Sequence, residues 1–596
     1  MKQKGKKREF NDLLLPVLFV IGILPLITRL IVYESGLSKY SWFSDNDITT
    51  DFFSYYKSYS FLIIAIVCTA ILFFLFLLYR TDWKDIRVYV PLGIYSIASI
   101  LSTVFSVDTH SSLVGGAVRF ENLFVLLGYI ILSIYTYQIV KKKEDFEVII
   151  KVLVISICIL SIIGFFQMIG QDIFRFELIQ KIIIPSDYWS DYLGEIKSHL
   201  SSNAVSLTLF NPNYASVYIA MVIPFFIVLA IIAEGTKERV IYLTMIGFML
   251  ILLYMTYSRT GLVSLFASLF ILGCFYRRHL KNIWKQLLLI VVVSLCILTG
   301  LDSFSDFTFI SKIAATFKSF DMKQFNYNLE EILTQEDNIY IRYKGEELYV
   351  SFKDNDDTVG ELYFSNGTGD DISHFYNNDD KILVLEPFDI LQFKVEKISD
   401  ISYIVAKINN RIWRFSYDEE IGYQYFNDLG KYDSLKPIQS FGFDNYQNIA
   451  SGRGYIWSRS LPLLKNNLFL GSGPDTFPLI YPQWDYVGKA NNCKTPYTLI
   501  EKPHNMYLSI ALQTGLVSLM AIVFFFFAYI IKSIRLYKKC KLDNYVESIG
   551  LGCLVACISY MVSGLFNDSA IQTSPIFWVF LGLGMAANHM IEKKLS

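Results

Sequence analysis

Long apolar stretches separated by short charged segments dominate the chain. Twelve of them are about 20 residues long, the length that an α-helix needs to cross the roughly 30 Å hydrocarbon layer of a bilayer. They lie near residues 12–33, 59–79, 88–106, 121–140, 149–169, 213–233, 240–257, 260–276, 286–303, 504–531, 547–566 and 571–591. This pattern predicts an all-α polytopic membrane protein with about 12 transmembrane helices.

The pattern changes between the ninth and tenth apolar stretches. Short aromatic and β-branched runs, divided by turn residues, fill the segment from about 330 to 430 and indicate strands. The runs are 339–343, 348–352, 361–364, 381–386, 389–398, 401–407, 411–417 and 421–426. They predict seven or eight strands in a small sandwich or barrel.

Helical character returns after this insert, at about 445–466. We therefore expect three parts in the chain. Transmembrane helices 1 to 9 occupy 1–303, a large loop occupies 304–502, and transmembrane helices 10 to 12 occupy 503–596. Within the loop, the β-rich insert at about 330–430 precedes a helical, functional part at about 445–502.

Composition and charge fit a membrane protein and set its orientation. The chain is 53% hydrophobic and only 18% charged, which excludes an ordinary soluble protein. Basic residues cluster before the first stretch and in alternate short loops, which marks the cytoplasmic side. The expected location is thus the plasma or inner membrane, with both termini cytoplasmic and the loop 304–502 on the exoplasmic face. Binding to nucleic acid is not expected, because acidic residues predominate in the β insert.

Three ionisable side chains are expected at the exoplasmic ends of spans. Arg119 lies between the third and fourth stretches, Arg259 in the tight turn between the seventh and eighth, and His504 at the start of the tenth. Such groups near hydrocarbon are functional candidates, although an arginine there can simply reach toward headgroups and a lone histidine is often structural. Guanidinium suits a diphosphate, and imidazole, with an ordinary pKa of about 6.5, can accept a proton.

Two asparagines precede the sixth stretch and allow two interpretations. Asn211 and Asn213 flank Pro212, a pattern typical of a helix cap, and their amides are also suited to sugar hydroxyls. The histidines are scattered without the spacing of metal ligands, so no metal and no cofactor is expected.

Several motifs together resemble the O-antigen ligase and O-antigen polymerase superfamily of bacterial membrane glycosyltransferases. Their order along the chain is more specific than any one of them. They are 115–121, 162–167, 210–214, 258–261, 453–473, 503–508 and 513–516. Two features depart from the family pattern: Asn122 replaces the glycine of a frequent Arg-x-Glu-Gly motif, and the β insert is larger than the usual loop.

The resemblance implies a GT-C-like, metal-independent glycosyltransferase. It would take a glycan from an undecaprenyl-diphosphate-linked donor and join it to an acceptor hydroxyl on a glycan or glycolipid, in surface polysaccharide assembly. His504 and Arg259 correspond to the family's catalytic residues, and Arg119 and Arg453 to further diphosphate ligands. Asn211, Asn213, Asn505 and Tyr507 are expected to bind substrate.

The mechanism we expect is an inverting displacement, with His504 as general base and Arg259 stabilising the leaving diphosphate. Ligase and polymerase activity cannot be separated, because both use the same donor. A transporter of lipid-linked glycan is a weaker alternative, since charge lies at the ends of the spans and not at the bilayer midplane. A receptor or scaffold role would depend on the β insert alone.

Overall fold

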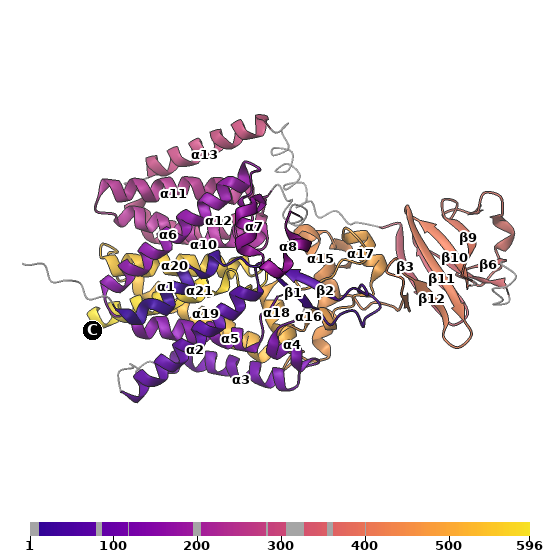
Figure 1. The fold of residues 1–596 in the computed structure, drawn as a ribbon, viewed down its shortest axis with the longest axis horizontal. Coiled ribbons are helices and arrows are strands. Elements are labelled where there is room, and N and C mark those ends of the chain that lie inside the picture. The colour runs from indigo at the N-terminus through magenta and orange to yellow at the C-terminus, as the bar shows by residue number, and fades with distance from the viewer. Residues whose placement is uncertain are drawn as a thin grey trace, which may run out of the picture.

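The computed structural model describes residues 11–78, 86–116, 119–194, 204–281, 284–304, 327–353, 361–399 and 401–595. The molecule is elongated, with a bundle of helices at one end and a module of strands at the other (Figure 1). Shorter helices and loops from distant parts of the chain lie between the two. This intermediate layer carries the candidate site.

Eight helices are long and apolar enough to cross a membrane, and each overlaps a predicted stretch. They are α2 (Tyr55–Leu77), α6 (Lys143–Met168), α10 (Pro212–Ile232), α11 (Thr236–Met255), α12 (Arg259–Leu280), α19 (Gly515–Tyr537), α20 (Tyr545–Ser563) and α21 (Ser574–Leu595). Shorter apolar helices occupy Asp12–Leu26, Val90–Val104 (α3), Leu123–Ile139 (α5) and Trp284–Ile297 within α13 (Trp284–Phe304). The polytopic all-helical prediction is confirmed at this level, and twelve crossings stay a prediction.

The centre of the bundle is formed by α10, α20 and α21. In an apolar segment of 18 residues within α10, and likewise within α21, 89% of the residues are buried inside the protein, against 17% in α2. A helix that is apolar all round belongs in such a core, whereas an apolar face exposed at the periphery suits lipid. Helices α10 and α21 therefore lie in the core of the bundle, and α2 lies at its periphery.

Two predicted spans differ in the structure. The first ends as a helix by Leu26, because residues Ile31–Glu34 form β1 and pair with β2 (Ile48–Asp51). The tenth is divided into α18 (Met506–Gln513) and α19 by a break at Thr514. Gly515 has a φ of 88°, and a Cβ there would lie 2.0 Å from the carbonyl oxygen of Phe469. This close approach packs the loop before Gly471 against the break.

The strand module is a sandwich of two antiparallel sheets. A four-stranded sheet has the order β3-β4-β5-β6, and a seven-stranded sheet has the order β13-β12-β11-β10-β9-β8-β7. The strands are β3 (Leu329–Thr334), β4 (Ile339–Tyr343), β5 (Glu346–Phe352), β6 (Leu362–Asn366), β7 (Tyr376–Asn377), β8 (Ile382–Leu383), β9 (Gln392–Ile398), β10 (Ile401–Ile408), β11 (Arg411–Asp418), β12 (Gly422–Phe426) and β13 (Tyr432–Asp433). The predicted count was too low, because β3, β7 and β13 carry weak strand signals or are only two residues long.

The strand module shares its hydrophobic core with the intermediate layer. Leu37 and Trp42 pack into this core, as do Tyr486 and Val487 of α17 (Tyr486–Asn492). Asn491 of the same helix donates a hydrogen bond of 2.9 Å to the carbonyl of Leu329 in β3. The module is therefore built onto the rest of the protein and is not tethered by its ends alone.

Helical segments complete the intermediate layer. The helix predicted near 445–466 is α15 (Ile449–Ser460), followed by a 3-10 helix at Leu461–Lys465. Helix α16 (Phe477–Ile480) follows, and α7 (Glu177–Ile183) and α8 (Trp189–Tyr192) lie in the connection before α10. Three residues from Ala450 to Gly452 have left-handed backbone angles, so the chain bends sharply before Arg453.

Candidate functional site

His504 lies just before α18 and is held by the loop between α20 and α21. Its Nδ1 atom is 2.9 Å from Oδ2 of Asp568, and the backbone N–H of Asn505 donates to the other carboxylate oxygen at 3.2 Å. The imidazole is 37% exposed, whereas the Asp568 side chain is buried. The histidine thus presents one edge to a buried acid and the other to the outside.

Asp568 determines which nitrogen of His504 carries the proton. Burial acts to raise the pKa of Asp568, but His504, Lys502 and other cations outweigh it and hold the pKa below its ordinary value. A carboxylate only accepts hydrogen bonds, so Nδ1 of the imidazole must be the donor. In a neutral His504 the free lone pair is therefore on Nε2, the nitrogen that faces away from Asp568.

Arg453 extends the same cluster from the start of α15. Its Nη2 donates to the side-chain oxygen of Asn567 at 3.1 Å, next to Asp568, and its Nη1 donates to the carbonyl of Ala450 at 3.2 Å. Burial lowers the pKa of Arg453, and the positive charge of Arg259 lowers it further. Arg259 is therefore close enough to Arg453 for their charges to interact.

Arg259 is the first residue of α12, directly after the tight connection from α11. Its side chain is half-buried, and the hydroxyl of the preceding Ser258 is buried with no hydrogen-bond partner among the described residues. The amide nitrogen of Asn567 is also buried and unpaired within the described part of the chain. Unsatisfied buried donors are rare in proteins, and a ligand group can satisfy them.

Arg119 lies in the loop before α5, close enough to Asp568 for their charges to interact. Its guanidinium lies 4.4 Å from the ring centroid of Phe210 and forms an ion pair with Glu501 at 2.5 Å. Burial opposes the charge, but Tyr214, Glu501 and Asp568 outweigh it, so the pKa of Arg119 is raised. The Nε and Nη1 atoms have no hydrogen-bond partner in the described structure. Arg119 thus keeps its charge and two free donors.

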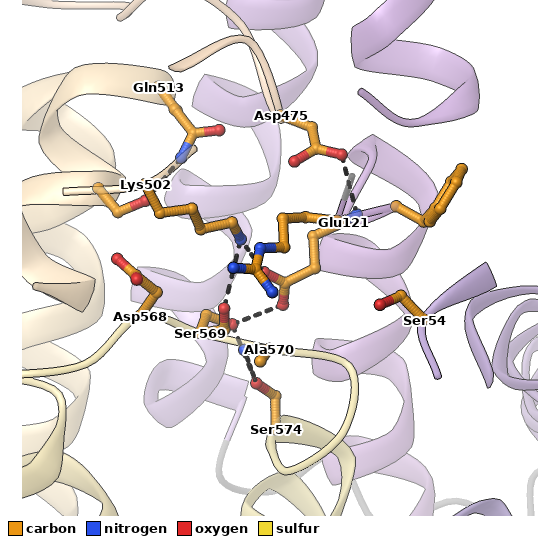
Figure 2. Close-up of polar contacts among 12 residues, drawn as sticks. Ser54, Glu121, Asp475, Lys502, Gln513, Asp568, Ser569, Ala570 and Ser574 are labelled. Carbon is orange, nitrogen blue, oxygen red and sulfur yellow. Dashed lines mark hydrogen bonds and ion pairs between the residues drawn. The ribbon is translucent and has the colours of Figure 1, made fainter. Parts of the chain in front are cut away.

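Two ion pairs join the loop that contains Arg119 to the segment before His504, and Figure 2 shows the pair of Glu121 with Lys502. Arg119 pairs with Glu501, and Glu121 pairs with Lys502, both members of the second pair being buried. Glu121 also accepts hydrogen bonds of 2.8 Å from Tyr129 and Ser569. The Arg-x-Glu part of the motif at 119–121 is therefore a structural clamp, and Ser569 connects it to the loop that holds Asp568.

The glycine-rich loop at 471–475 contacts the backbone on both sides of Arg119. Asp475 accepts hydrogen bonds from the backbone N–H groups of Gly116 at 2.7 Å and Glu121 at 3.2 Å. Gly473 has a φ of 110°, and a Cβ there would lie 2.0 Å from the hydroxyl oxygen of Ser106. The sequence signal at this loop thus reflects close backbone packing.

Removing one member of the buried pair should destabilise the protein. Lys502→Met is expected to cost about 3–5 kcal/mol of stability, since it leaves the Glu121 carboxylate buried without its cation. Thermal unfolding of the detergent-solubilised protein measures this loss. The double variant Glu121→Gln/Lys502→Met should recover much of it, and Lys494→Met, at an exposed position, is the control. If the single and double variants unfolded at the same temperature, the stabilising role of the Glu121–Lys502 pair would be contradicted.

The remaining predicted residues make structural contacts near the cluster. The side-chain oxygens of Asn211 and Asn505 cap α10 and α18, accepting from Tyr214 and Leu508 at 3.0 Å. Tyr507 donates to the carbonyl of Met561 at 2.8 Å. Asn213 is half-buried in the first turn of α10, and its carbonyl accepts from Ser216. A direct role in substrate binding stays a prediction for all four.

Sequence analysis missed Asp568, Asn567 and the pair formed by Glu121 and Lys502. Asp568 lies in a loop of Phe-Asn-Asp-Ser between two apolar spans. The available signal in the sequence was the pair of polar residues, Asn567 and Asp568, in a short connection between two apolar spans. Among the described residues, no group of three or more His, Cys, Asp or Glu side chains has an arrangement that could hold a metal ion.

Comparison with known proteins agrees with the resemblance in the sequence. A protein-family model described as O-antigen ligase matches residues 402–523, from the last strands of the sandwich through α15, His504 and α18 into α19. A search of curated proteins finds no match. The matched segment contains Arg453 and His504, and the chain around it has the apolar helices of a membrane protein. Residues 402–523 of this chain are therefore similar to the O-antigen ligase family.

Proposed function

We propose that the protein is a membrane glycosyltransferase that moves a glycan from a polyprenyl-diphosphate donor to an acceptor hydroxyl. The observation that carries this proposal is the pairing of His504 with buried Asp568 beside Arg453. A proton acceptor and a group of cations are what a displacement with a diphosphate leaving group requires.

The reaction is proposed as one displacement at the anomeric carbon. Nε2 of His504 takes the proton of the acceptor hydroxyl while its oxygen forms a bond to that carbon. The bond from the anomeric carbon to the diphosphate oxygen breaks, and the electron pair leaves with the diphosphate. Attack from the face opposite the leaving group inverts the anomeric centre. Asp568 stabilises the imidazolium that forms.

The arginines hold the donor in this scheme. Arg259 and Arg453 provide two guanidinium forks within electrostatic range of each other, and the diphosphate offsets their mutual repulsion. Arg119 adds two unpaired donors, and Ser258 and Asn567 add neutral ones. Because the repulsion between the cations is relieved when an anion binds, this arrangement favours a diphosphate over a neutral ligand.

We further propose that the site faces the exoplasmic side of the membrane. The site residues lie at the N-terminal ends of α10, α12 and α18, and in the loop between α20 and α21. Basic residues gather at the opposite ends of neighbouring segments, at 141–143, 237–239 and 535–541. The positive-inside tendency supports placing those ends in the cytoplasm.

A reconstituted reaction tests the proposal and distinguishes polymerase, ligase and transport activity. Purified protein in liposomes is supplied with undecaprenyl-diphosphate-linked oligosaccharide, and the products are analysed by mass spectrometry. Lengthening of lipid-linked chains would indicate polymerase activity, and appearance of sugar on a different carrier would indicate ligase activity. Movement of the donor across the bilayer without any transfer would favour transport instead. Normal transfer by His504→Ala at normal expression would contradict the assigned base.

A further inference from the structure

A polar groove of about 190 Å³ lies where the strand module meets the intermediate layer. One wall is formed by β3 and β4, with Glu330, Glu331 and Arg342. Arg459 of α15 and Trp484 lie on the other wall. None of these five residues takes part in the reaction proposed above, so the groove is a separate feature.

Four of the six charged groups that line the groove form ion pairs with each other. Arg459 donates from Nε to Asp485 at 3.1 Å, and Nε of Arg342 lies 4.0 Å from Glu330. The lining contains three acidic and three basic residues in all: Glu330, Glu331, Asp485, Arg342, Lys436 and Arg459. A phosphate or other anion would favour an excess of cations, which this groove lacks. The lining offers many donors and acceptors with little net charge.

Trp484 gives the groove an aromatic surface. Its side chain is 36% exposed, although large aromatic residues usually bury more of their area. An indole ring has an apolar, electron-rich face, and the guanidinium and carboxylate groups nearby are planar hydrogen-bonding groups. A sugar ring has the complementary character, because its C–H face can stack on the indole while its hydroxyls bond to the charged groups.

Helix α15 connects this groove to the candidate site. Arg453 contacts Asn567, and the indole N–H of Trp457 donates to the carbonyl of Pro503 at 2.9 Å, next to His504. Arg459 lies six residues after Arg453, which is about 9 Å along the helix axis at 1.5 Å per residue. A chain of a few linked sugars spans such a distance.

The groove is also held rigidly. Asp485 accepts from the backbone N–H of Gly488 at 2.8 Å, and so fixes the start of α17 next to Trp484. Tyr486 donates to Asp433 of β13 at 2.8 Å, which ties the start of α17 to the strand module. A preformed site loses less conformational entropy on binding than one that must be ordered.

We propose that this groove is a carbohydrate subsite that holds the glycan chain a few sugars away from the reacting centre. This inference rests on the proposed function, because it takes the ligand to be the glycan that is transferred or extended. The strand module is then part of glycan recognition. The chain held there is either the donor glycan or the acceptor glycan, which have the same chemistry.

A binding experiment tests the subsite without requiring turnover. The probe is the set of repeat-unit oligosaccharides released by mild acid from lipid-linked glycan of the cells that produce the protein. Saturation-transfer NMR with the full-length protein in detergent measures binding. Trp484→Ala should raise the Kd by about tenfold through loss of the stacking surface, and Arg342→Gln should also weaken binding. Trp189→Ala, with an indole 38% exposed outside the groove, is the matched control.

Kinetics then identify the source of the chain. If the donor glycan occupies the groove, Trp484→Ala raises KM for donors with several repeat units and leaves single-unit donors unchanged. If the acceptor occupies it, KM rises for long acceptors only. Unchanged oligosaccharide binding by Trp484→Ala and Arg342→Gln, with normal thermal unfolding, would overturn the subsite. Wild-type binding that depends on Trp484, without transfer of any donor, would support the subsite and contradict the proposed reaction.

Discussion

Asp568→Asn is expected to reduce glycan transfer by about 10²–10⁴-fold while leaving donor binding nearly unchanged. The amide can donate a hydrogen bond to Nδ1 of His504, which moves the imidazole proton to Nε2. The nitrogen facing the acceptor then has no free lone pair, and the imidazolium has lost its buried counter-charge. Single-turnover transfer with a fixed amount of lipid-linked donor measures the chemical step directly.

Controls separate this effect from a loss of folding. Asp187→Asn changes an exposed carboxylate outside the site and should transfer glycan normally. Asp568→Asn should still fold but should unfold at a lower temperature than the wild type, because the amide loses the buried charge that His504 and Lys502 stabilise. The combination His504→Ala/Asp568→Asn should be no slower than His504→Ala alone, since the two residues act as one unit. Transfer by Asp568→Asn within a few-fold of wild type would refute the assigned tautomer.

The second large effect on glycan transfer is expected when Arg259 or Arg453 is replaced. Arg259→Ala and Arg453→Ala should each lower the transfer rate by about 10²–10³-fold, the usual cost of removing one preorganised donor from a developing charge. Arg453 is half-buried next to Asn567, so its loss also leaves the Asn567 side-chain oxygen without its donor. Transfer assays over a range of donor concentrations distinguish weaker donor binding from a slower chemical step.

Lysine substitutions refine this test. Arg259→Lys and Arg453→Lys keep the charge but lose the planar fork, so partial activity would indicate that both charge and geometry contribute. Arg175→Ala, at an exposed position outside the site, is the matched control. If Arg259→Ala and Arg453→Ala both transferred glycan at the control rate, the diphosphate site would have to lie elsewhere.

The sequence predicted the architecture well, because its signals are local. Each apolar stretch is a property of about 20 consecutive residues, and each predicted strand run covers only four to ten. The exceptions are places where a distant partner decides the outcome. Ile31–Glu34 are apolar enough to continue a helix, but they pair with Ile48–Asp51. Gly515 breaks the tenth stretch because the backbone at Phe469 packs against it.

The site was predicted only in part, for the same reason. His504 and Arg259 were identifiable because a titratable group at the end of an apolar span is conspicuous on its own. Asp568 lies 64 residues after His504. The partnership of Glu121 with Lys502 spans 381 residues. Such pairs become visible only once the helices have been arranged in space.

The shared core of the strand module has a practical consequence for experiments that truncate the chain. Excising residues 330–430 would strip Tyr486 and Val487 of their packing partners and leave Leu37 and Trp42 facing water. Loss of activity in such a truncated protein could then result from misfolding around α17. It would not show that the strand module recognises the glycan. Point changes on the outer surface of the sandwich are the informative way to probe this module.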